Sequence, residues 1–66
     1  MTIGEHIRKV REEKGYSRER LARRTGLHLQ TILRWEQGLS FPNLMPLIEV
    51  AQVLNVSLDE LIGRRT

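Results

Sequence analysis

Apolar residues recur every three or four positions along most of this 66-residue chain, the spacing that places them on one face of a helix. Five such segments can be distinguished, and short stretches rich in Gly, Ser, Asn or Pro separate them. No segment can be placed as a strand. The pattern therefore predicts an all-α fold, a compact bundle of five helices, and the length allows a single domain over residues 1–66.

The first helix is predicted to begin after Thr2, where Thr-Ile-Gly-Glu matches a capping box. In this motif the hydroxyl of Thr2 and the carboxylate of Glu5 each accept a hydrogen bond from a backbone N–H at the helix start. Gly15 is expected to end the helix, since the residue past a helix end often needs a left-handed backbone. The inward face consists of Ile3, Ile7 and Val10.

Residues 18–37 predict two short amphipathic helices joined by a tight turn at Gly26. Ser17 can cap the first helix, and the second is expected to run over residues 29–37 with His28 at its N-cap position. The faces that the two helices bury consist of Leu21, Ala22, Thr25, Leu27, Ile32 and Trp35. The outward face of the second helix consists of Leu29, Gln30, Leu33 and Arg34. A helix held on one face in this way can enter a groove.

The remainder of the chain predicts a loop and two further helices. Asn43 is a good cap for the fourth helix, and Pro46 falls in its first turn, where the missing N–H costs nothing. Ser-Leu-Asp-Glu at residues 57–60 predicts a second capping box at the start of a short fifth helix. Phe41 in the loop is expected to tuck under it, and residues 64–66 are expected to fray. The apolar positions of the two helices are Leu47, Val50, Ala51, Leu54, Leu58, Leu61 and Ile62.

Charge is distributed unevenly along the chain. Residues 1–36 contain nine Lys or Arg against five Asp or Glu, a net charge of +4, whereas residues 37–62 contain three acids and no base. Two arginines near the C-terminus bring the whole chain to +3. A polyanion would be steered to the N-terminal half. The alternative interpretation is that these basic residues form an ordinary solvated surface with no polyanionic partner.

Several classes of protein are disfavoured by what the sequence lacks. There is no cysteine, and His6 and His28 have no partners at ligand spacing, so we expect no metal and no cofactor. No apolar run is long enough to cross a membrane, and the N-terminus lacks the apolar core of a signal peptide, so a cytoplasmic protein is expected. No nucleophile with a base, phosphate-binding glycine loop or pair of carboxylates suggests an enzyme.

Three stretches, taken in order, resemble a known family. Residues 21–27 read Leu-Ala-x-x-x-Gly-Leu, residues 30–38 read Gln-Thr-Ile-x-Arg-Trp-Glu-x-Gly, and residues 47–61 read LIEVAQVLNVSLDEL after a turn at Pro42. From Ile3 to Ile62 the chain resembles the lambda repressor/Cro-type helix-turn-helix domain, also called the xenobiotic-response-element family of bacteria and phages. The resemblance implies a five-helix domain whose third helix enters the major groove of double-stranded DNA.

The resemblance also implies roles for individual residues. It implies that four residues contact bases: Leu29, Gln30, Leu33 and Arg34. Gln30 could bond the edge of an adenine, and Arg34 the edge of a guanine or a phosphate. It implies phosphate contacts by Arg18, Thr31, Ser40 and Asn43. Arg18 occupies a position where the family commonly has a glutamine. Structural roles fall to Arg11, Ala22, Gly26, Ile32, Trp35 and Glu36, with Arg11 and Glu36 forming an ion pair. Trp35 is expected to pack beneath the third helix rather than to stack on a base.

Two functions are compatible with these observations. The first is a sequence-specific transcriptional regulator, expected to be a repressor, acting as a homodimer with recognition helices about 34 Å apart. The second is a protein-interaction module, antitoxin-like or a co-regulator adaptor, that uses Leu29 and Leu33. These two leucines motivate it, because they replace residues that are commonly polar in the family and cannot read a hydrogen-bond pattern. At the C-terminal end, Leu58, Leu61 and Ile62 either complete the core or form the homodimer contact.

Overall fold

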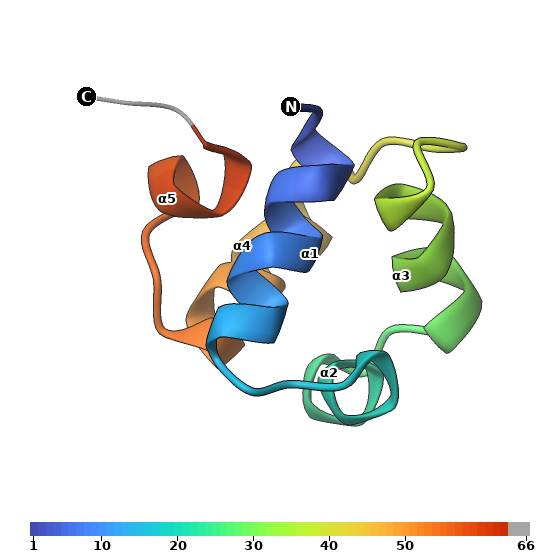
Figure 1. Cartoon of the computed structure of the whole chain (residues 1–66). Coiled ribbons are helices and arrows are strands. Elements are labelled where there is room, and N and C mark those ends of the chain that lie inside the picture. Colours follow the sequence, from blue (N-terminus) through green and yellow to red (C-terminus); the bar gives the residue numbers. More distant parts are fainter. Residues whose placement is uncertain (64–66) are drawn as a thin grey trace.

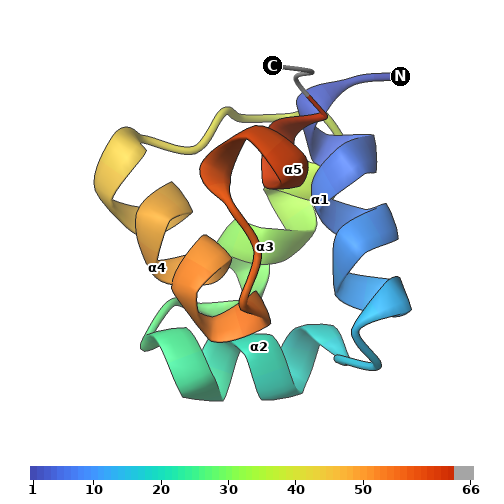
Figure 2. The same ribbon diagram turned by 90° about the vertical axis from the view of Figure 1, so that its left-hand side faces the viewer.

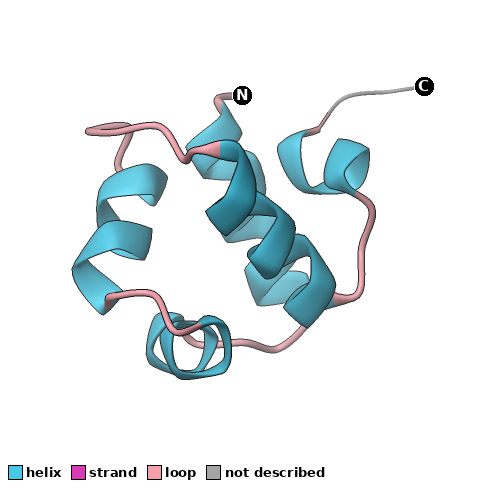
Figure 3. Cartoon of the chain, turned by 180° about the vertical axis from the view of Figure 1, so that it is seen from behind, coloured by secondary structure: helices cyan, strands magenta, loops and turns pink. Residues whose placement is uncertain are grey.

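The computed structural model describes residues 1–63, which form five helices and no strand. The helices are α1 (Ile3–Glu13), α2 (Arg18–Thr25), α3 (Leu29–Glu36), α4 (Leu44–Leu54) and α5 (Leu58–Ile62). In Figure 1, α1 and α4 lie at the centre, α3 and α5 flank them on opposite sides, and α2 closes one end; Figure 3 gives the reverse view. The predicted five-helix all-α fold is confirmed, and the expected fraying of residues 64–66 lies outside the described part of the chain.

Side-chain caps fix the starts of three helices. The capping box at α1 is confirmed, because Thr2 Oγ1 accepts from the N–H of Glu5 at 3.2 Å and Glu5 Oε1 accepts from the N–H of Thr2 at 3.1 Å. These hydrogen bonds lower the pKa of Glu5. The predicted cap at Ser17 is also present, with its Oγ 3.0 Å from the backbone nitrogen of Arg20.

Two predicted caps differ in the structure. At α5, Ser57 Oγ accepts from the N–H of Glu60 at 3.0 Å, but the return bond from the Glu60 carboxylate is not formed, so only half of the capping box exists. At α4, Asn43 occupies the N-cap position with an extended backbone, yet its side chain makes no cap hydrogen bond. Asn43 is therefore the N-cap residue as predicted, but it lacks the side-chain hydrogen bond that a capping asparagine usually makes, and it is exposed.

The core is one apolar cluster to which all five helices contribute. α1 packs against α3 and α5, while α2 packs against α3 and α4. Trp35 is only 4% exposed, which confirms that it packs beneath α3. The buried apolar residues are Ile7, Val10, Leu21, Ala22, Ile32, Trp35, Leu47, Val50, Ala51, Leu54 and Leu61, and the partly buried ones packed on them include Leu58 and Ile62.

α1 and the end of α3 approach each other closely. Gly4, in the first turn of α1, is buried, and a Cβ built on it would overlap the backbone carbonyl oxygen of Trp35. The same Cβ would lie 2.9 Å from the carbonyl carbon of Trp35 and 3.2 Å from the Cα of Glu36. Only a residue without a side chain lets the two backbones come this close.

Two smaller expectations need correction, and one of two alternatives for the C-terminal residues is supported. α3 ends at Glu36, and Gln37 is its C-cap. Phe41 does not tuck under its loop, since 78% of it is exposed. The C-terminal apolar residues complete the core, because Leu61 is fully buried and its neighbours Leu58 and Ile62 pack on the cluster. Among residues 1–63, no helix is both long and apolar enough to span a bilayer.

Candidate nucleic-acid interface

α2 and α3 form a helix-turn-helix with a three-residue connection over residues 26–28. Gly26 has a φ of +77°, a left-handed backbone that glycine adopts without strain, so it allows the sharp change of direction. Thr25 fastens the turn, because its hydroxyl donates to the carbonyl oxygen of Leu21 at 2.7 Å and accepts from the N–H of Leu27 at 3.3 Å. The second helix is thereby held at a fixed angle to the first.

α3 buries one face and exposes the other. Ile32 is fully buried on the inner face, next to Trp35. On the outer face Gln30 and Arg34 are exposed, and within residues 1–63 no hydrogen bond or ion pair engages their side chains. The structure therefore brings the predicted base-contacting residues onto one free surface. The exposed fraction of Leu29 is 41%, and Leu33 and Thr31 are half-buried at the edges of this surface.

A buried carboxylate ties α3 to the two preceding helices. Glu36, whose side chain is 1% exposed, accepts two hydrogen bonds from Arg11, at 2.8 Å from Nε and 3.0 Å from Nη2. Arg11 also donates from Nη1 to the carbonyl oxygen of Tyr16 at 2.7 Å. The hydrogen bonds that Arg11 donates to the Glu36 carboxylate raise the pKa of Arg11. The predicted Arg11–Glu36 ion pair is confirmed, and its parallel two-bond geometry is the strong form of this interaction.

Arg18 is a second cation on the same carboxylate, and this contact was not predicted. Its Nε donates to Glu36 Oε1 at 2.9 Å, while 34% of its side chain remains exposed. Within residues 1–63 the terminal nitrogens of Arg18 make no hydrogen bond, so they stay available for a phosphate. The pairing joins residues 18 positions apart, and no local pattern reveals it; the only sequence signal is an arginine where the family commonly has glutamine. The phosphate contact of Arg18 stays a prediction.

The other predicted phosphate contacts lie beyond the C-terminal end of α3 or in its first turn. Asn43 is exposed and Ser40 half-buried in the segment between α3 and α4, and Thr31 lies in the first turn of α3. At the start of α4 no side-chain cap accepts a hydrogen bond from the first N–H groups. On α2, Arg20 lies with its Cζ 4.3 Å above the ring of Tyr16, a cation–π contact at the surface.

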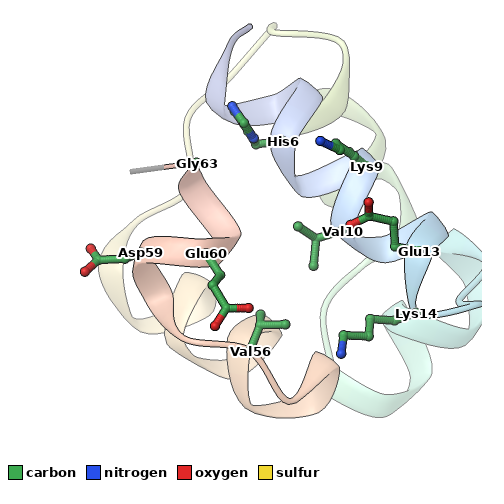
Figure 4. Close-up of a pocket in the computed structure, with 9 residues that line it drawn as sticks. All are labelled: His6, Lys9, Val10, Glu13, Lys14, Val56, Asp59, Glu60 and Gly63. Carbon is green, nitrogen blue, oxygen red and sulfur yellow. The ribbon is translucent and has the colours of Figure 1, made fainter. Parts of the chain in front are cut away.

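A cleft of about 470 Å³ lies between α1 and α5, on the other side of α1 from α3. Figure 4 shows its lining, in which Lys9 and Glu13 come from α1 and Glu60 of α5 points into the cleft, whereas Asp59 points away from it. The lining consists of His6, Lys9, Val10, Glu13, Lys14, Val56, Asp59, Glu60 and Gly63. Over residues 1–63 no group of three or more possible ligands could hold a metal ion. The cleft is separate from the outer face of α3.

The comparison with protein families identifies the class. A sequence model of the helix-turn-helix family HTH_3 matches residues 7–61, so the chain belongs to this helix-turn-helix family. In the curated proteins the chain is similar to the SPbeta prophage-derived uncharacterized HTH-type transcriptional regulator YonR of Bacillus subtilis (strain 168), at 37% identity over 60 residues. That match covers 91% of this chain and 56% of YonR, so the chain spans little more than half the length of that relative.

Two solved structures of similar proteins contain DNA. The biofilm regulator SinR in complex with DNA superposes with a TM-score of 0.84 at 37% identity, covering 89% of this chain and 95% of that one. The P22 c2 repressor in complex with a synthetic operator superposes with a TM-score of 0.86 at 26% identity, covering 98% of each chain. The expected resemblance to repressor-type helix-turn-helix domains is thereby confirmed.

Proposed function

We propose that this chain is a cytoplasmic, sequence-specific DNA-binding transcriptional regulator, a repressor, that inserts α3 into the major groove. The observation that carries the proposal is the position of α3, held by Ile32 and Trp35 on one side with Gln30 and Arg34 free on the other. The DNA complexes of SinR and the P22 c2 repressor support it. Binding to double-stranded DNA as a homodimer, without a cofactor or a catalytic step, is part of the same proposal.

Sequence recognition would combine two kinds of contact. Gln30 can pair with the N6 and N7 edge of adenine, and Arg34 with the O6 and N7 edge of guanine. Leu29 and Leu33 can contact thymine methyl groups, so they add shape and exclude water rather than read hydrogen bonds. Phosphate contacts set the register of the helix on the duplex without carrying sequence information. We assign those contacts to Arg18, Thr31, Ser40 and Asn43.

Replacing Gln30 and Arg34 together with alanine is expected to abolish sequence preference. Each good bidentate base contact contributes about 1–3 kcal/mol of discrimination, so the double variant should lose roughly 30-fold or more in affinity for its site. A duplex selected from a random library by the purified protein serves as the probe. Gln52→Ala, an exposed position on α4, is the matched control and should bind as the wild type does. Undiminished binding by the double variant would contradict the proposal.

Replacing Arg18 with glutamine is expected to make binding less sensitive to salt. Each phosphate contact from a cation adds about one to the slope of log K against log salt concentration, so the slope should fall by about one. Arg18→Lys keeps the charge and is expected to keep the slope. Affinity titrations on the selected duplex at several salt concentrations measure both variants. An unchanged slope in Arg18→Gln would remove Arg18 from the phosphate contacts.

The exposed Leu29 keeps the protein-interaction hypothesis open as the second candidate function. Replacing Leu29 and Leu33 together with serine distinguishes the two candidates. If they contact thymine methyl groups, affinity for the selected duplex falls by roughly 10-fold, in line with the loss of two apolar contacts. If they hold a protein partner instead, DNA affinity is retained while capture of that partner fails.

A further inference from the structure

Two leucines lie on the outer face of α3, and the core of the bundle does not account for them. We call Leu29 and Leu33 the leucine row, because residues four positions apart lie one above the other on a helix. Leu29 is 41% exposed and Leu33 is half-buried, yet neither belongs to the core cluster or packs against it. Figure 2, which views the bundle from the side of α5, places α3 on the far side, so α5 leaves this face uncovered.

A row of polar side chains runs beside the leucine row. Gln30 and Arg34 are also four positions apart, and both are exposed, with side chains that no hydrogen bond or ion pair within residues 1–63 engages. The outer face of α3 therefore presents two parallel rows of different chemistry. A ligand that covers both rows must offer hydrogen-bonding groups next to small apolar groups.

The edges of DNA bases in the major groove have this combination. They carry hydrogen-bond donors and acceptors together with one apolar group, the methyl group at C5 of thymine. A leucine side chain has no hydrogen-bonding atom, so its contact is favourable only where the methyl group leaves water. Cytosine lacks this methyl group, whereas 5-methylcytosine has it at the same ring position as thymine. The leucine row can therefore distinguish pyrimidines by the substituent at C5 but not by the group at C4.

We propose that the leucine row reads the C5 methyl group of a pyrimidine, so that α3 recognises thymine or 5-methylcytosine at that position; this inference rests on the proposed function and deepens it. The DNA that binds most tightly then combines purine edges for Gln30 and Arg34 with a methylated pyrimidine for the leucine row. Where that position holds a cytosine, its methylation raises the affinity. The methylation state of the DNA thereby controls binding.

The area of the leucine row fits methyl groups better than a protein partner. Leu29 and Leu33 at these exposures present on the order of 100 Å² together. A stable protein–protein contact buries about 800 Å² on each partner, whereas one methyl group presents about 30 Å². The leucine row can therefore cover one or two methyl groups, and it is too small to hold a protein without much wider contacts.

Uracil in place of thymine tests the proposal, because uracil lacks only the methyl group. The probe is the duplex selected by the purified protein, with its thymines replaced one at a time. We expect affinity to fall about 4-fold at one or two positions of the selected sequence, the effect of removing one methyl group from an apolar contact. Thymines outside the selected sequence are the control and should tolerate uracil. Uracil that is neutral at every position would overturn the proposal.

Cytosine methylation gives the second measurement. At each position where uracil weakens binding, a duplex with cytosine opposite guanine is compared with one that has 5-methylcytosine opposite guanine. The methylated duplex should bind about 4-fold more tightly, since the two differ by one methyl group. Equal affinities would overturn the dependence on methylation.

The variant Leu29→Ser with Leu33→Ser assigns the methyl contact to the leucine row. Its urea midpoint should change little, because neither leucine packs on the core, while its preference for thymine over uracil should disappear. Gln52→Ala, exposed on α4, is the control and should keep the 4-fold preference. A preference that persists in the serine variant would overturn the role of the leucine row.

The same measurements separate this inference from the proposed function. A wild type that selects no duplex from the library would overturn the proposed function and this inference with it. A wild type that selects a duplex and tolerates uracil throughout would overturn this inference alone. In that case the leucine row is left to the protein-interaction hypothesis.

Discussion

Replacing Glu36 with alanine is expected to lower the free energy of unfolding by about 3–5 kcal/mol, the usual result of removing one partner of a buried ion pair. The carboxylate accepts from Arg11 and from Arg18, and the Arg11 side chain is only 6% exposed. Without Glu36 that guanidinium would lie buried with no counter-charge. A chain of this length has about 3–10 kcal/mol of stability in total, so a large share of the molecules should be unfolded near room temperature.

Urea unfolding followed by the fluorescence of Trp35 measures this loss, because this single tryptophan is buried in the folded chain. Arg8→Ala is the matched control. The Arg8–Glu12 pair has its nearest atoms 3.4 Å apart and both side chains more than half exposed, so losing it should cost less than about 1 kcal/mol. If Glu36→Ala lowered the free energy of unfolding no more than Arg8→Ala does, the buried carboxylate would not be the group that holds α3 against α1 and α2.

Gly4→Ala is expected to destabilise the domain by about 2–3 kcal/mol, as overpacking of a tight core contact does. In an ordinary helix position the same substitution stabilises by up to about 1 kcal/mol, so the sign of the effect is diagnostic. Here the new Cβ would overlap the carbonyl of Trp35, a backbone group that cannot rotate away. α1 must therefore move away from α3.

Two readouts test Gly4→Ala. The urea midpoint should fall, whereas Gln52→Ala at an exposed helical position should leave it unchanged or raise it slightly. Affinity for the selected duplex should also fall, because the end of α3 rests on this contact. A raised midpoint in Gly4→Ala would show that the two helices separate at no cost.

Local sequence patterns predicted the helices well because the causes are local. The Thr2–Glu5 capping box and the cap at Ser17 involve residues three positions apart, and the buried face of α3 follows from the spacing of Ile32 and Trp35. The Arg11–Glu36 pair came from the family resemblance, since nothing in the spacing of these residues indicates it. The caps and the buried face of α3 could be predicted because they depend on residues close in sequence, and the ion pair because the family resemblance implies it.

The features that sequence reasoning missed depend on distances across the bundle. Gly4 reads as a neutral helix residue until the carbonyl of Trp35 is placed against it. From the sequence Arg18 is a cation without a partner, whereas in the structure it donates a hydrogen bond to Glu36. Phe41 was expected to be covered because burial is favourable for a phenyl ring, but hydrophobicity does not say whether a loop can reach an open place in the core. These three cases are set by packing rather than by local preference.

The two ends of α3 are held very differently, and this bears on how the domain could change its target. At the C-terminal end Glu36 is bonded to two arginines and the Trp35 carbonyl rests on Gly4. At the N-terminal end His28 provides no side-chain cap, and the first-turn bond from the N–H of Ile32 to the carbonyl of His28 is long, at 3.4 Å. The last turn of α3 is therefore fastened by ion pairs, whereas the first turn has no side-chain cap. If α3 reads DNA as proposed, substitutions near Gln30 would change the operator while leaving the ion pairs of Glu36 intact.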